Sequence, residues 1–159
     1  MSKLISNSKE GFQIYKWAKQ IFKFNRSLTG SGTVQTLNFI KKKIPNFKIK
    51  KIKSGTKIYD WTIPLEWNVK KAYIEDLKGN KLINFNDNNL HLVGYSIPIN
   101  KVIQFKDLKK KLHTIKKMPN AIPYRYSYYS RDWGFCLQHN KLKKFKDQKY
   151  RVVIDSSLK

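Results

Sequence analysis

The spacing of the apolar residues changes at Pro45. Before this residue, apolar side chains recur every three or four positions, and after it they alternate with polar ones. The first spacing is typical of an amphipathic helix, and the second is typical of a half-buried strand. The chain therefore combines two unlike parts, a helical segment over residues 1–45 and a β-rich segment over residues 46–159.

The segment before Pro45 predicts two helices. A capping box, with Asn7 as N-cap and Glu10 three residues later, precedes the first helix, which is expected to end near Phe24. Its apolar face is formed by Ile14, Trp17, Ala18, Ile21 and Phe22.

The stretch RSLTGSG (residues 26–32) separates the two helices. Its glycines permit backbone angles that other residues avoid, and either Thr29 or Ser31 is expected to cap the second helix, which Pro45 ends. The apolar face of this helix is formed by Val34, Leu37, Ile40 and Ile44. Two short helices cannot bury such faces alone, so they need the rest of this chain or a partner beyond it.

The segment after Pro45 predicts a mostly antiparallel, sandwich- or barrel-like domain of short strands with one short helix, so the fold class is α+β. Lys78-Gly79-Asn80 is typical of a hairpin turn. The short helix is expected over residues 106–113. Strands are expected at 47–49, 56–67, 69–74, 81–85, 90–95 and 150–154.

The stretch PNAIPYRYSYYSRDWGFCLQH (residues 119–139) concentrates aromatic residues. The alternation breaks at residues 130–132, which favours a hairpin of two aromatic strands. One interpretation is a sheet core with tyrosine hydroxyls at its edge. The other is a ligand cleft lined by some of these hydroxyls together with Arg125 and Arg131. Both interpretations can be correct at once. The aromatic residues are Tyr124, Tyr126, Tyr128, Tyr129, Trp133 and Phe135.

The formal net charge of +24 suggests a polyanionic partner, but the kind of basic residue argues against a specific one. Only four of the 34 basic residues are arginines, and the lysines are spread along the whole chain. Lysine is a solvated point charge, whereas arginine makes the bidentate contacts that read bases and phosphates. Weak, salt-sensitive binding to nucleic acid is expected, without specific recognition.

The residues alone give no catalytic or metal site. His91, His113 and His139 match no short zinc-ligand spacing, and the adjacent Glu75 and Asp76 stand beside a turn. The only cysteine, Cys136, follows strand-like aromatic residues, which favours a buried thiol over a nucleophile.

The sequence also indicates the cellular location of the protein. A single cysteine cannot form an internal disulfide, and no apolar run approaches the length of a signal peptide or a membrane span. A cytoplasmic protein without a membrane partner is expected.

Five strings, in this order, resemble one known family: RSLTGSG, YDWTIPLEWNV, DNNLHLVGYSIP, LHTIKKMPNAIPYRYSYYSRDWGFCLQHN and VVIDSSLK. The chain is similar, over nearly its whole length, to bacterial aminopeptidase-like proteins found with polysaccharide-biosynthesis genes, which carry domains of unknown function. The resemblance implies a zinc-exopeptidase-like domain that begins with the two helices. A β-rich domain is inserted into that domain, and a winged-helix domain lies at the far end.

The resemblance also implies how this segment would work. Zinc is expected in the full-length relative, whose metal ligands lie beyond the segment that resembles this chain. This chain is therefore expected to contain no catalytic residue and no metal ligand. The segment would be an inactive N-terminal fragment that shapes the substrate cleft. Its partner would be the rest of the peptidase-like domain, with homo-oligomer contacts as a further role. The alternative is a free-standing module that binds a sugar-like or peptide ligand. The cleft candidates are Arg26, Tyr124, Tyr126, Tyr128, Tyr129 and Trp133.

Overall fold

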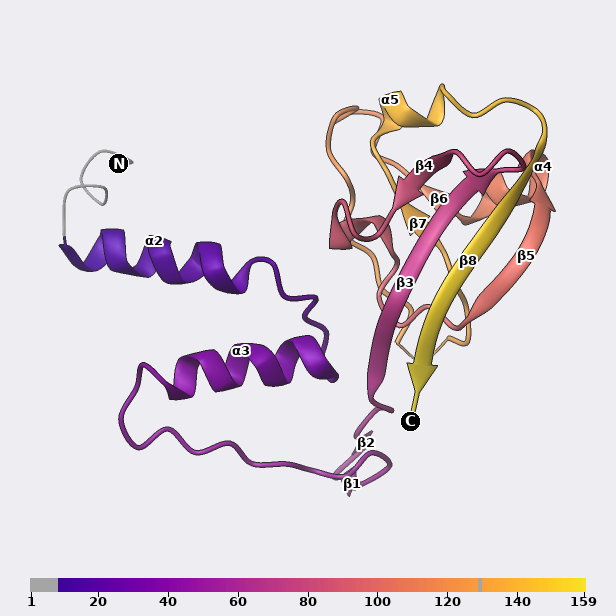
Figure 1. Cartoon of the computed structure of the whole chain (residues 1–159). Coiled ribbons are helices and arrows are strands. Elements are labelled where there is room, and N and C mark those ends of the chain that lie inside the picture. The colour runs from indigo at the N-terminus through magenta and orange to yellow at the C-terminus, as the bar shows by residue number, and fades with distance from the viewer. Residues whose placement is uncertain (1–8, 129) are drawn as a thin grey trace. The chain divides into compact units, whose positions relative to one another are not determined.

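The computed structural model of the chain describes residues 9–128 and 130–159 (Figure 1). These residues form two compact units, the first ending at Lys51 and the second beginning at Ile52. The boundary follows shortly after the change of spacing at Pro45.

The first unit contains the two expected helices, α2 (Lys9–Ile21) and α3 (Ser31–Lys41). Asn7, the expected cap of the first helix, lies outside the described residues. α3 follows Gly30, which has a φ of 103° and provides no side-chain capping hydrogen bond, so the expectation that Thr29 or Ser31 caps this helix is wrong. A glycine takes that position because a side chain would strain the positive φ.

The turn between the helices is held by hydrogen bonds from side chains to backbone carbonyl groups. Thr33 Oγ1 donates to the carbonyl oxygen of Ser27 at 2.6 Å, and the Arg26 guanidinium donates to the carbonyl oxygen of Ile21. A Cβ atom at Gly32 would overlap the carbonyl group of Asn25. Only glycine permits this close approach, which explains the second glycine of RSLTGSG.

No residue of α2 is buried. Phe12 is 64% exposed and Phe22, one residue beyond the helix, is 72% exposed. The helix has the amphipathic spacing that the sequence predicts, and its apolar side chains remain accessible to solvent.

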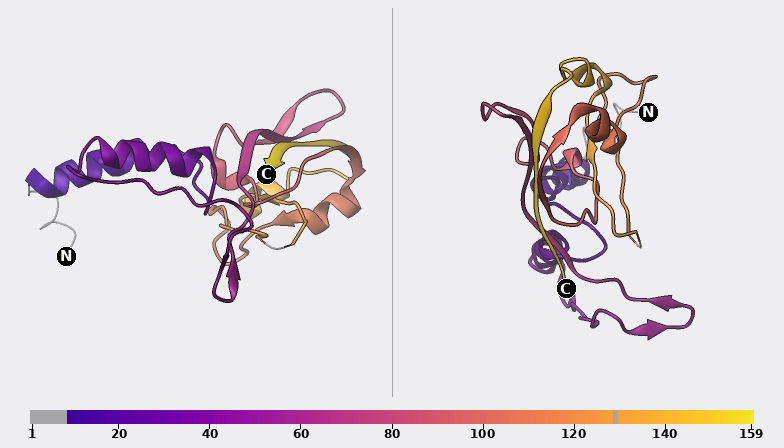
Figure 2. Two further views of the ribbon diagram at one scale, coloured as in Figure 1. Left: turned by 90° about the horizontal axis from the view of Figure 1, so that it is seen from below. Right: turned by 90° about the vertical axis from the view of Figure 1, so that its right-hand side faces the viewer.

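The second unit is built on a four-stranded antiparallel sheet in the order β4-β3-β8-β5 (Figure 1). Its strands are β3 (Trp67–Asp76), β4 (Lys81–Asn84), β5 (Ile99–Gln104) and β8 (Lys149–Leu158). β8 is the last strand in sequence and lies between β3 and β5, so the sheet is complete only when the end of this segment has joined it. β1 (Lys57–Ile58) and β2 (Trp61–Thr62) form a separate hairpin, which extends away from the sheet (Figure 2).

The hairpin turn between β3 and β4 is the one that the sequence predicts. The Asp76 carboxylate accepts hydrogen bonds from the backbone N–H groups of Lys78 and Asn80, each at 2.9 Å. Gly79 has a φ of 87°. Asp76 is therefore a turn residue, and its hydrogen bonds to Asn80 lower the pKa of its carboxyl group.

One face of the sheet carries the core. Tyr150, Val152 and Ile154 of β8 are buried with Ala72 and Ile74 of β3. The layer that covers them consists of short elements and irregular segments (Figure 2). These elements are η1 (Asn89–His91), α4 (Phe105–Leu108), η2 (Lys109–Lys111), β6 (Leu112–His113), β7 (Phe135–Cys136) and α5 (His139–Leu142). The α+β class and the mostly antiparallel pairing are confirmed, but the covering layer is not a second long sheet.

Several expected elements differ from the observed ones. The expected strand at 47–49 is absent from the described structure, and 90–95 contains the end of η1 and two isolated bridges instead of a strand. The expected helix at 106–113 is only four residues of α-helix, continued by η2 and β6. Strand β5 and helix α5 were not expected, because Lys101 and Lys141 obscure their short apolar patterns.

The expected aromatic hairpin is wrong, because residues 92–97 lie between its two halves. Gly94 bridges Tyr126 on one side, while Leu92 bridges Phe135 on the other. The N–H of Val93 donates to the carbonyl oxygen of Gly134 at 3.0 Å, and that of Gly94 donates to Arg125 at 2.8 Å. Each half satisfies its backbone groups with this intervening segment, and β7 pairs in parallel with β6.

Candidate binding site

A row of five aromatic rings runs from the core to the surface of the second unit. The centroid distances are 5.6 Å for Trp67–Tyr95, 5.0 Å for Tyr95–Tyr128, 4.4 Å for Tyr126–Tyr128 and 5.9 Å for Tyr124–Tyr126. Trp67 is 3% exposed and Tyr124 is 66% exposed. The inner rings are therefore fixed by packing, whereas the outer rings present their faces to solvent.

Tyr95 is held in this row by its backbone. It has a φ of 64°, a left-handed conformation that is uncommon for a residue with a side chain. The next residue, Ser96, is fully buried, and its carbonyl oxygen accepts hydrogen bonds from Trp67 Nε1 at 3.0 Å and from Ser156 Oγ at 2.8 Å. Strands β3 and β8 thus fix the loop that directs Tyr95 toward Tyr128.

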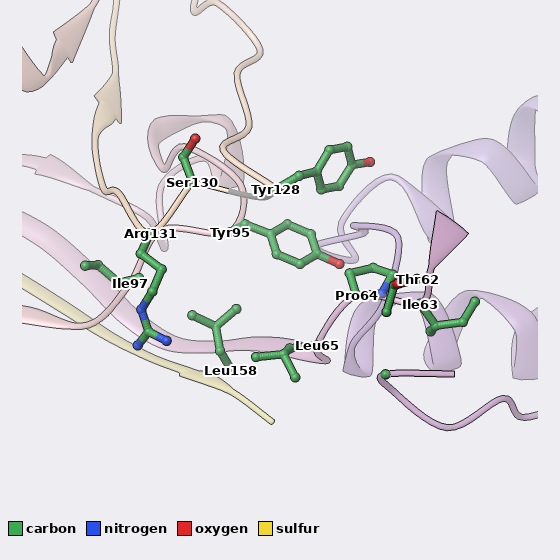
Figure 3. A pocket seen from close by; sticks show the side chains of 11 residues that line it. Thr62, Ile63, Pro64, Leu65, Tyr95, Ile97, Tyr128, Ser130, Arg131 and Leu158 are labelled. Carbon is green, nitrogen blue, oxygen red and sulfur yellow. The ribbon is translucent and has the colours of Figure 1, made fainter. Parts of the chain in front are cut away.

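A cavity of about 310 Å³ lies beside Tyr95 and Tyr128 (Figure 3). In the close view the two tyrosine rings are neighbours, and the Arg131 side chain enters from the opposite side near Leu158. The remaining lining comes from Gly55, Thr62, Ile63, Pro64, Leu65, Ile97 and Ser130. The cavity therefore has mainly apolar walls and one charged side chain.

Asp132, which follows Arg131, is bonded elsewhere. Its carboxylate accepts hydrogen bonds from Lys111 Nζ at 2.6 Å and from the backbone N–H of Trp133 at 2.8 Å. These bonds hold the pKa of Asp132 below its usual value. Asp132 is thus the ion-pair partner of Lys111.

The cleft candidates from the sequence fall in different places. Tyr128 lines the cavity, and Tyr124 and Tyr126 are the exposed end of the aromatic row. Trp133 packs against the core, with Lys111 Nζ 5.8 Å from its ring centroid, so it does not line the cavity. Arg26 belongs to the first unit, and Tyr129 lies outside the described residues.

Sequence reasoning missed Tyr95, Leu65 and Leu158 as lining residues. Leu65 and Tyr95 stand in alternating stretches, which predict strands, and β8 continues to Leu158, beyond its expected end at Ile154. The string Gly94-Tyr95-Ser96 contained a signal, because a glycine beside an aromatic residue often marks a close backbone approach. A Cβ atom at Gly94 would lie 3.3 Å from Tyr126 Cβ.

The histidines and the cysteine of the second unit lie outside the lining of the cavity. His91 is buried, and its Nδ1 lies 2.7 Å from the carbonyl oxygen of Cys136. Burial lowers the pKa of His91 and raises the pKa of the Cys136 thiol to about 11. His139 Nδ1 lies 3.0 Å from Thr114 Oγ1. The described part of the chain contains no group of three or more His, Cys, Asp or Glu side chains that could hold a metal ion.

The zinc ion implied by the resemblance does not fit these residues. A catalytic zinc site needs three protein ligands directed at one point. The described residues bring no three His, Cys, Asp or Glu side chains to one such point. Within the described ranges there is also no helix long and apolar enough to cross a membrane.

Known proteins resemble this chain over most of its length. The chain is 47% identical over 159 residues, or 99% of its length, to a Clostridium acetobutylicum protein named for polysaccharide biosynthesis and an aminopeptidase-like domain. It also matches the crystal structure of a protein from that organism named as a peptidase, with a TM-score of 0.92 and 47% identity. The structural match covers 99% of this chain and 37% of the other.

The chain spans about 36% of the length of the Clostridium protein that it matches. The resemblance stated from the sequence motifs is confirmed by these similarities. Residues 66–157 match the family described as a domain of unknown function, DUF2172. Because this match covers more than half of the chain, the protein belongs to the DUF2172 family.

Proposed function

We propose that this chain is the substrate-cleft part of an aminopeptidase-like zinc hydrolase and has no hydrolytic activity by itself. The similarity to the Clostridium protein supports the assignment, because the chain matches that protein at 47% identity yet spans only 36% of it. The catalytic groups would then be supplied by residues outside this segment.

The observation that carries the cleft role is the exposed end of the aromatic row. Tyr124 and Tyr126 are 66% and 54% exposed, although each lies within 6 Å, centroid to centroid, of another tyrosine ring. Such rings offer an apolar face with a hydroxyl at the edge, which suits contact with peptide or sugar groups. Their rigid inner neighbours, Tyr95 and Trp67, would hold this surface in place.

The arrangement of the possible metal ligands among the described residues supports the absence of a catalytic role in this segment. His91 contacts the backbone of Cys136 and His113 pairs with Cys136 between β6 and β7, but these residues do not form a group of three side chains that could hold a metal ion. In the proposed arrangement zinc would be held outside this segment, and the tyrosine surface would bind and orient the substrate next to it.

A chimera tests this function. Replacing the matching segment of the Clostridium protein by this chain should leave a chelator-sensitive aminopeptidase activity on aminoacyl anilides, whereas the chain alone with added Zn²⁺ should show none. Turnover by the chain alone would overturn the inactive role. The absence of chelator-sensitive turnover from both the Clostridium protein and the chimera, over a panel of aminoacyl substrates, would overturn the hydrolase assignment.

The cavity beside Tyr128 favours a second function, a binding module that works without a catalytic partner. Its volume of about 310 Å³ is at the lower end of the range for small-molecule sites, roughly 300–1,000 Å³. This alternative predicts saturable ligand binding to the chain and no dependence of any peptidase on its presence. Deleting only the part of the Clostridium protein that matches the second unit, residues 52–159, distinguishes the two, since only the cleft role predicts lost turnover with the catalytic domain still folded.

A further inference from the structure

The charge of Arg131 has no ion-pair partner among residues 9–128 and 130–159. The ion pairs of the described residues join Lys110 to Asp107, Lys111 to Asp132 and Arg151 to Glu75. Arg131 is in none of these pairs, and the carboxylate nearest to it in sequence is occupied by Lys111. Arg131 is exposed and lines a mainly apolar cavity, so its guanidinium group is available to an anion from solution.

The walls of the cavity define the rest of the ligand. Leu65, Ile97 and Leu158 supply aliphatic surface, and the ring of Tyr95 borders the same space (Figure 3). Apolar walls bind apolar groups because the contact removes both surfaces from water. A ligand that fills the cavity and reaches Arg131 must therefore combine an apolar body with a negative end.

The small number of cationic and N–H donor groups in the lining favours a carboxylate over a phosphate. Among the lining residues that the structure describes, Arg131 is the only cationic side chain, and none belongs to a helix N-terminus or a glycine-rich nest. Phosphate sites gather several donors around their oxygens. A single guanidinium group matches the two oxygens of one carboxylate in a bidentate pair.

The cavity is formed in advance of binding. Tyr95 is 2% exposed, packs between Trp67 and Tyr128, and has a left-handed backbone conformation. Sparsely populated backbone conformations cluster at ligand sites, where the surrounding structure enforces them. A preformed wall lowers the ordering cost that a ligand must overcome.

We propose that this cavity binds the carboxyl-terminal residue of a short peptide, or an N-acyl amino acid, with the apolar side chain inside the cavity and the carboxylate on Arg131. The volume of about 310 Å³ suits one or two amino-acid residues. The site deepens the proposed function, because such molecules are substrates or products of peptidases. Binding nevertheless needs no catalytic metal, so the two proposals can fail separately.

Calorimetry with the full chain tests the site. N-acetyl-phenylalanyl-leucine should bind saturably, and its carboxyl-terminal amide, which lacks the negative charge, should bind at least tenfold more weakly. Arg131→Gln should weaken binding of the acid at least tenfold and leave binding of the amide unchanged. Arg125→Gln is the matched control, since Arg125 is exposed in the same stretch and does not line the cavity.

A second pair of variants tests the cavity itself. Leu65→Trp should fill the space and abolish binding, while Leu77→Trp, at an exposed position outside the cavity, should not affect it. Equal affinity for acid and amide, an unchanged affinity in the Arg131 variant, or no saturable binding up to millimolar concentration would each overturn the proposal. Those results would not affect the proposed function, which the turnover of the chimera tests separately.

Discussion

The indole Nε1 of Trp67 donates a hydrogen bond to the carbonyl oxygen of Ser96 at 3.0 Å. The same oxygen accepts a second bond from Ser156 Oγ, so β3 and β8 both hold the loop that carries Tyr95. The central strands of the sheet and the inner wall of the cavity thus share one buried acceptor. Stability and ligand binding should therefore respond together to changes at this point.

Trp67→Phe should lower the free energy of unfolding by about 1–3 kcal/mol, because it removes a buried hydrogen bond and part of a packed ring. Urea unfolding measures this change. Trp61→Phe provides the control, since Trp61 is 41% exposed and the change should stay below about 0.5 kcal/mol. Equal effects of the two substitutions would contradict the anchoring role of Trp67.

The thiol of Cys136 should be unreactive in the folded protein. Burial removes it from solvent and raises its pKa to about 11, so very little thiolate exists at pH 8. A disulfide reagent such as Ellman's should titrate no thiol in native protein and one thiol per chain after unfolding in urea. Rapid reaction of the native protein would show that this residue is accessible and would reopen a nucleophilic role.

His91 should make the stability depend on pH below neutrality. Burial lowers its folded pKa below 6.5, so as the pH falls the unfolded state takes up the proton first. The stability contributed by neutral His91 is then complete above about pH 6.5 and is lost as the pH falls through the folded pKa. NMR titration of its ring protons should give a midpoint below 6.5.

Substitution of His91 isolates this effect. His91→Gln should cost about 1–3 kcal/mol at pH 7, because the carbonyl group of Cys136 loses its partner at 2.7 Å, and should flatten the pH dependence of stability below pH 6.5. Leu77→Gln, at an exposed position without a titratable group, should keep the pH dependence of the parent protein. A slope that survives in the His91 variant would place the titrating group elsewhere.

Asp132 should stabilise the fold only when it is ionised. Its hydrogen bonds to Lys111 and to the N–H of Trp133 lower the folded pKa below 3.8, so this stability is present above that value and is lost as the pH falls through the folded pKa. The side chain is 50% exposed, so solvent screening limits the effect to less than about 1 kcal/mol. Asp132→Asn should be less stable than the parent at pH 6 and equal to it at pH 2 in urea unfolding.

The parts of the fold that were predictable depend on local signals. Asp76 and Gly79 define a hairpin turn within five residues, and alternation in β3 and β8 reports the buried face of the sheet directly. The spacing of Ile14, Trp17 and Ile21 likewise predicts α2 without knowledge of the rest of the chain.

The aromatic stretch could not be predicted in the same way. Tyr126 and Phe135 have the residue types of a hairpin, but their backbone partners, Gly94 and Leu92, lie more than 30 positions earlier in the chain. Local pattern does not report such pairing. For the same reason the sequence identified Tyr128 as a cleft residue but missed Tyr95, whose place in the row depends on a positive φ and on the hydrogen bonds to Ser96.

The most direct test of the cleft role is the kcat/KM of the chimera, in which this chain replaces the matching segment of the Clostridium protein, before and after Tyr128→Ala. The account predicts a loss of at least tenfold in kcat/KM for peptide substrates, with an unchanged content of bound metal. Tyr59→Ala, at a residue that is 99% exposed and outside the cavity, should leave kcat/KM unaltered. An unchanged kcat/KM in a folded Tyr128→Ala chimera would contradict the claim that this segment shapes the substrate cleft.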